Sequence, residues 1–106
     1  MTNTSAAINR LADLVLAQQK ARLADQYPNS PWMAESETVQ VVPGRKYTKI
    51  DVGPAHNMSG RYMVDNVTGE IFGIKGYGVV HKGHRYGTLD TIEAWNWGGY
   101  TARRVA

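Results

Sequence analysis

The sequence predicts an α+β fold in which an N-terminal helix packs on a small antiparallel sheet of three to five strands. Two observations predict it. Residues 6–26 place apolar side chains at helical spacing among good helix formers. From residue 38 onward, short stretches of alternating apolar and polar residues are separated by proline, glycine and asparagine turns. A chain of 106 residues without internal repeats suits one domain, with the helix at 1–27, a linker at 28–37 and a β-rich part at 38–106.

The first helix is expected to run from Ala6 to Gln26. Thr4 or Ser5 can cap it, and Pro28 ends it because a proline disfavours helical backbone in the residue before it. Its apolar stripe is formed by Ile8, Leu11, Val15 and Leu23. Two uses of this stripe are open. We favour packing on the sheet, and the alternative is a homodimer through residues 6–26.

The linker at 28–37 contains two prolines and one tryptophan. We expect Trp32 to fill a gap between the helix and the sheet, because large aromatic side chains are mostly buried. The alternative is an exposed Trp32 that anchors a partner. Beyond the linker, residues 38–42 and 45–52 are expected to form two strands joined by Pro43-Gly44, with alternating side chains on one face. The residues of that face are Val39, Val41, Thr48, Ile50 and Val52.

A β-hairpin follows, with its turn expected at residues 66–69. A type I turn completed by a glycine at positive φ fixes a register in which Val64 faces Phe72. The same register places Arg61 opposite Lys75 on the outer face, where two cations either splay into water or flank an anion. The core face then carries Tyr62, Val64, Phe72 and Ile74.

The C-terminal part is expected to hold a short helix before the last strand. Asp90 and Glu93 have the spacing of a capping box, which predicts a helix from Asp90 to about residue 96. Two glycines at 98–99 end this helix, and residues 100–105 form the last strand. Trp95 and Trp97 are expected to be buried at this corner.

Composition excludes several classes of protein. The chain has no cysteine, which rules out disulfides and thiolate metal sites. No stretch approaches the ~20 apolar residues that span a bilayer, and the N-terminus lacks a signal-peptide pattern, so we expect a cytoplasmic location. Residues 43–106 hold nine basic and five acidic residues, so this half is the place to seek anionic partners.

The densest candidate feature is the basic, glycine-spaced stretch 75–87, which we expect to be a loop. No acidic residue occurs from Ile71 through Leu89. Cations suit phosphates and flat rings suit bases, so nucleic-acid contact is one candidate, and a structural or protein-binding loop is the favoured one. The hypothetical binding residues are Arg61, Lys75, Tyr77, Lys82, His84, Arg85 and Tyr86.

Enzymatic readings are weaker. His81 and His84 could join His56 in a zinc site, but no carboxylate lies near them in sequence, and surface histidines are the favoured interpretation. The glycines at 73, 76 and 78 match neither phosphate-binding fingerprint, because no helix-forming run follows them. A metal-free ribonuclease could use His81, His84, Arg85 and Tyr86. We assign no catalytic residue, no metal ligand and no cofactor.

Three stretches of the chain carry a resemblance to a known group of proteins. They are KYTKIDVG, TGEIFGIKGYGVVHKGHRYGTLDT and WNWGGYTARR. Together they resemble small uncharacterised proteins of phages that infect mycobacteria and related actinobacteria, over about residues 45–104. The resemblance implies a phage origin and a host-cytoplasmic location, and it transfers no functional residue. The sequence therefore favours a non-enzymatic binding module that contacts a host or phage protein. Nucleic-acid binding through residues 75–87 is the alternative, and a ribonuclease comes third.

Overall fold

The computed structural model describes residues 4–75, 79–99 and 101–105. A long helix, α1 (Thr4–Gln26), and a short one, α2 (Pro31–Glu35), precede a sheet of five strands. The sheet is followed by a 3₁₀ helix, η1 (Leu89–Ala94), and a small hairpin, β6 (Trp95–Asn96) with β7 (Arg103–Arg104). The five strands are β1 (Glu37–Val42), β2 (Tyr47–Pro54), β3 (Ser59–Asp65), β4 (Glu70–Ile74) and β5 (Val80–Thr88).

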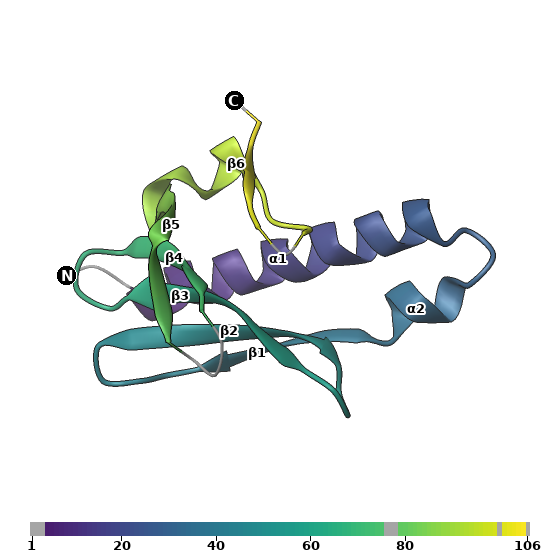
Figure 1. Ribbon diagram of the computed structural model, residues 1–106, viewed down its shortest axis with the longest axis horizontal. Helices are drawn as coiled ribbons and strands as arrows, with labels where there is room; N and C mark the ends of the chain where they lie inside the picture. The colour runs from purple at the N-terminus through teal and green to yellow at the C-terminus, as the bar shows by residue number, and fades with distance from the viewer. Residues whose placement is uncertain (1–3, 76–78, 100, 106) are drawn as a thin grey trace.

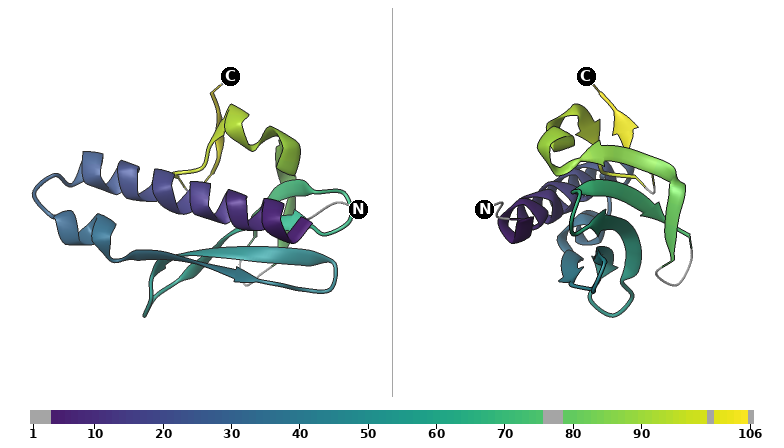
Figure 2. Two further views of the ribbon diagram at one scale, coloured as in Figure 1. Left: turned by 180° about the vertical axis from the view of Figure 1, so that it is seen from behind. Right: turned by 90° about the vertical axis from the view of Figure 1, so that its left-hand side faces the viewer.

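The sheet is an antiparallel meander in the order β1-β2-β3-β4-β5. Figure 1 shows α1 lying along it, with η1 and the β6–β7 hairpin closing the top. Seen along the helix, the strands curl around one side of α1 (Figure 2). The predicted α+β fold class is confirmed. In the described part of the chain, neither helix is long and apolar enough to cross a membrane.

The stripe of α1 that faces the sheet is buried, with Leu11 and Val15 fully enclosed. The helix begins at Thr4, two residues earlier than expected, so Thr4 and Ser5 lie in its first turn. Polar residues of α1 also hold the C-terminal corner. Gln18 Oε1 accepts the Trp97 N–H at 2.6 Å, and the Arg22 Nε–H donates to the Gly98 carbonyl. The helix thus packs on the sheet, as we favoured.

The first two strands pair as expected. Val39 lies opposite Val52 and Val41 opposite Ile50, and their side chains join the core. The pairing begins at Val42 and Lys49, so the connection is a wider loop than the tight Pro43-Gly44 turn that the sequence predicts.

The register of the β3–β4 hairpin differs by one residue from the prediction. Val64 lies opposite Ile71, and Met63 lies opposite Phe72. The reason is that Asp65 closes the turn: its Oδ1 accepts the N–H groups of Val67 and Thr68, and its carbonyl accepts the N–H of Gly69. Gly69 adopts the expected positive φ of 75°. Because side chains alternate along a strand, one residue of slip exchanges the faces of β4.

The predicted core cluster is therefore half correct. Tyr62 and Val64 are fully buried in the core, but their β4 neighbour there is Ile71. Phe72 lies on the opposite face and packs edge-to-face on Tyr47, with their ring centres 6.2 Å apart. Ile74 also lies on that face, against Gly60.

Most of the basic stretch that was expected to be a loop is strand β5. Its register with β4 shifts twice: Phe72 lies opposite Arg85, whereas Gly73 lies opposite His81. Residues 82–84 are therefore extra residues that bulge from the strand. Bulges and cations at a sheet edge oppose pairing with further strands.

At the C-terminal corner, the cap of the short helix is Thr88, two residues before the expected Asp90. Asp90 N–H donates to Thr88 Oγ1, and Thr91 Oγ1 accepts the Thr88 N–H at 3.0 Å. Threonines thus make the capping box that the sequence assigned to two carboxylates. The last strand is shorter than expected, and Trp97 is fully buried, as predicted.

Candidate binding cleft and cationic edge strand

A cleft of about 550 Å³ opens where α1 ends, between α2 and the connection from β2 to β3. Its walls come from two stretches of the chain, residues 19–37 and residues 52–61. Both aromatic and charged side chains line it. The lining includes Gln19, Arg22, Tyr27, Trp32, Glu37 and Arg61.

Two exposed aromatic residues form the rim of this cleft. Trp32 is 62% exposed and Tyr27 is 45% exposed. The backbone around them is held by hydrogen bonds, from Tyr27 N–H to the Leu23 carbonyl and from Ser30 N–H to the Tyr27 carbonyl. Pro31 then begins α2, which carries Trp32. The expectation that Trp32 fills the core is therefore wrong, because the segment read as a linker turns into a helix that presents this ring outward.

The floor of the cleft is polar and buried. Gln19 is 4% exposed and Glu37 is 7% exposed, and Gln19 Nε2 donates to Glu37 Oε1 at 3.0 Å. The Arg22 Nη2 donates to Gln19 Oε1 at 3.3 Å, and Nη1 donates to Gln26 Oε1 at 2.9 Å. This network fixes the side chains of the floor before any partner arrives.

Arg61 belongs to the cleft and not to the outer face of the hairpin, where the sequence placed it. The register between β2 and β3 skips it: Ile50 lies opposite Tyr62, and Asp51 lies opposite Gly60. Such a bulge turns two successive side chains to one face. Arg61 is consequently 6% exposed, and its Nη1 donates to the Gly99 carbonyl at 2.8 Å. It cannot lie beside Lys75 on an exposed surface.

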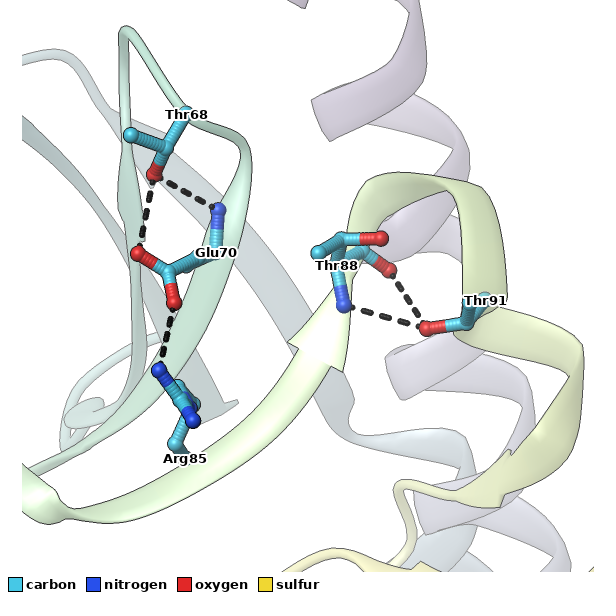
Figure 3. A network of polar contacts seen from close by, with 5 residues as sticks. All are labelled: Thr68, Glu70, Arg85, Thr88 and Thr91. Carbon is cyan, nitrogen blue, oxygen red and sulfur yellow. Dashed lines mark hydrogen bonds and ion pairs between the residues drawn. The ribbon is translucent and has the colours of Figure 1, made fainter.

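The second candidate surface is formed by β5 together with Lys75, the residue that follows β4. Lys75, Lys82, His84 and Arg85 are exposed, as predicted for binding residues. Figure 3 shows Arg85 reaching Glu70, with Nη1 2.8 Å from Oε2, while Thr68 Oγ1 donates to the other oxygen of Glu70. One of the predicted cations is thus already neutralised. Tyr77 lies outside the described residues.

Tyr86, predicted as a binding residue, is a core residue. It is 6% exposed, and its ring packs edge-to-face on Tyr62 and Trp95. Strand alternation and the bulge at 82–84 place Tyr86 inward, while its neighbour Arg85 points outward. Burial raises the pKa of Tyr86 above its usual value.

His81 and His84 stack with their ring centres 4.0 Å apart and their planes 7° from parallel. Within the residues that the structure describes, no three potential metal-ligating side chains cluster, so His56 does not join this pair. Of the four proposed ribonuclease residues, Tyr86 is in the core and Arg85 is paired with Glu70. The structure therefore brings His81 and His84 together but does not add Arg85 and Tyr86 to them as a ribonuclease site would require.

Sequence reasoning missed the cleft because its parts come from separate segments. Of the six lining residues named for the cleft, the sequence suggests binding roles for only two: Trp32, as the alternative to filling a gap between helix and sheet, and Arg61, on the outer face of the hairpin. One sequence signal could have indicated the cleft. Trp32 lies among prolines, serines and glutamates and not within an apolar stretch, which favours an exposed tryptophan. No protein-family model matches the chain, and no curated protein or solved structure is similar enough to match it.

Proposed function

We propose that the protein is a non-enzymatic binding module that contacts another protein through the cleft at the end of α1. The observation that carries this proposal is Trp32, 62% exposed at the rim of a cleft whose polar floor is already buried and hydrogen-bonded. Tryptophan, tyrosine and arginine are the residues that most often dominate the energy of protein interfaces. The rim and the floor contain all three.

The cleft combines an apolar rim with a charged floor, which suits recognition of a protein segment. Trp32 and Tyr27 offer apolar surface that loses contact with water when a partner covers it, which supplies affinity. Arg22 offers a positive charge at a fixed position, which supplies orientation and selectivity. Because the floor is held by internal hydrogen bonds, little side-chain entropy remains to be lost on binding.

The resemblance to phage proteins supplies the setting of the proposal. An accessory protein of a phage would act in the host cytoplasm, on a host or phage protein. Self-association through residues 6–26 remains a separate proposal, but the stripe it would use is enclosed between helix and sheet, which favours the cleft.

The proposal is tested by affinity capture from host lysate treated with nuclease. Tagged wild-type protein is expected to retain a protein that Trp32→Ala loses, because truncating an interface tryptophan typically costs at least ~2 kcal/mol, about 30-fold in affinity. Val67→Ala is the matched control, since Val67 is 91% exposed on the β3–β4 turn, which contributes no residue to the cleft. Retention of the same protein by wild type and Trp32→Ala would contradict the proposal.

A second candidate, nucleic-acid binding, is favoured by the stacked His81 and His84 beside the exposed Lys82. Flat rings can stack on bases and the cations can contact phosphates. This candidate predicts that log affinity for single-stranded RNA falls linearly with log salt. Lys82→Ala combined with Arg85→Ala should reduce the slope of log affinity against log salt by about one to two. The lower figure applies if the ion pair with Glu70 keeps Arg85 from contacting phosphate.

The measurement is fluorescence anisotropy of a labelled oligonucleotide across several salt concentrations. Arg10→Ala is a suitable control, since it also removes a surface cation, but one on α1, where Arg10 lies 3.7 Å from Glu93 of η1. An unchanged slope in the double variant would remove β5 as a nucleic-acid surface.

A further inference from the structure

The charges that line the cleft are unbalanced, and this imbalance indicates the chemistry of the partner. Two arginines and one carboxylate contribute to the lining. The carboxylate of Glu37 already accepts the amide of Gln19 at 3.0 Å. Arg22 is held instead by neutral oxygens, those of the Gly98 carbonyl and of two glutamine side chains. Arg61 donates to the Gly99 carbonyl at 2.8 Å.

The Arg22 guanidinium has no ion pair within the described residues, since no carboxylate oxygen lies within 4 Å of it. Its hydrogen bonds to Gly98, Gln26 and Gln19 use three of the five N–H groups that a guanidinium offers. Neutral acceptors fix the orientation of the group without forming an ion pair, so a carboxylate is the complementary ligand, and arginine can meet it with two parallel hydrogen bonds.

The rim adds an apolar requirement beside this charge. Trp32 and Tyr27 are exposed, and Met33 next to them is half-buried, so the opening of the cleft is apolar while its floor is cationic. A partner that satisfies both has an acidic side chain next to a large apolar one. The net charge of +3 of the chain would also attract an acidic partner at long range.

We infer that the cleft recognises an acidic, apolar peptide segment, whose carboxylate meets Arg22 while an adjacent apolar side chain covers Trp32. The inference rests on the proposed function and names the class of its partner. It differs from nucleic-acid binding in both surface and ligand, since the β5 cations lie outside the cleft.

The test uses two synthetic probes, a fluorescein-labelled peptide of alternating glutamate and leucine and its counterpart of alternating lysine and leucine. The acidic peptide is expected to bind saturably and the basic one not to bind. Arg22→Gln, which keeps a hydrogen-bonding side chain but removes the charge, should weaken the acidic peptide at least tenfold, and Trp32→Ala should do the same. Arg10→Gln removes one charge from the same helix outside the cleft, and it should leave the affinity within about twofold.

The variants distinguish failure of the acidic-peptide inference from failure of the proposed protein-binding function. Arg22→Gln also loses contacts to the C-terminal corner, so its thermal unfolding is compared with that of Arg10→Gln, and Tyr27→Ala gives a second rim variant. Trp32-dependent capture of a protein together with no preference for the acidic peptide would overturn the inference and leave the proposed function standing. Loss of acidic-peptide binding in Lys82→Ala combined with Arg85→Ala, but not in Arg22→Gln, would overturn the inference by placing the anion on β5.

Discussion

Trp97→Ala is expected to lower the free energy of unfolding by about 3–5 kcal/mol, the range for removing a fully buried tryptophan. The side chain is 0% exposed, and its ring packs edge-to-face on Tyr62 with 5.1 Å between ring centres. Its indole N–H donates to the Ile92 carbonyl at 2.9 Å, so truncation also removes a buried hydrogen bond. Such a loss is a large part of the 5–15 kcal/mol that stabilises an ordinary domain.

Equilibrium urea unfolding of wild type, Trp97→Ala and Trp32→Ala measures this effect. Trp32→Ala is the matched control, because it removes the same side chain from a 62% exposed position and should change stability by no more than about 0.5 kcal/mol. A loss below 1 kcal/mol for Trp97→Ala, or equal losses for the two variants, would contradict the description of the C-terminal corner as part of the core.

The protein is expected to lose stability in alkali through Tyr62. Burial raises the pKa of Tyr62 well above its usual value of 10.0; the charge of Arg61 lowers it to a smaller extent, and Tyr86 raises it slightly. Below about pH 10 both the folded and the unfolded chain keep this proton, so the contribution to stability is fully present. Above pH 10 the unfolded chain releases the proton while the folded chain retains it, so stability falls by about 1.4 kcal/mol per pH unit.

Urea unfolding at pH 9, 10 and 11 measures the slope, and Tyr62→Phe isolates its source. The variant loses the hydroxyl that donates to the carbonyls of Trp97 and Gly99, and it is less stable at pH 9 for that reason. Its stability should nevertheless fall less steeply between pH 10 and 11 than that of the wild type. Equal slopes in the two proteins would show that Tyr62 is not the group responsible.

The parts of the fold that the sequence predicted well are those with regular periodicity. The helical stripe from Ile8 to Leu23 and the alternation in β1 and β2 each require one face to be buried, and the structure buries those faces. The prediction of the β3–β4 register was wrong because the register depends on which residue closes the turn. Asp65 and Asn66 are both good turn residues, and the structure uses Asp65. The strand β5 was missed because glycines and cations interrupt its alternation.

The candidate site was less predictable than the fold for a physical reason. Arg61 reaches the cleft through a bulge, which adds one residue to a strand without a sequence signature at that point. Trp32 reaches the rim because α2 forms between two turns, whereas proline-rich segments usually suggest a linker. Exposure of Lys75, Lys82, His84 and Arg85 was predictable, since cations are seldom buried without a partner.

Hydroxyl-radical footprinting of the protein, alone and in complex with the protein it captures, tests the role of the cleft most directly. Trp32 and Tyr27 are both exposed in the free protein and are reactive residue types. We predict that both become protected in the complex while His84, which is also exposed, keeps its reactivity. Protection of His84 with unchanged Trp32 and Tyr27 would place the partner on β5 and contradict the account.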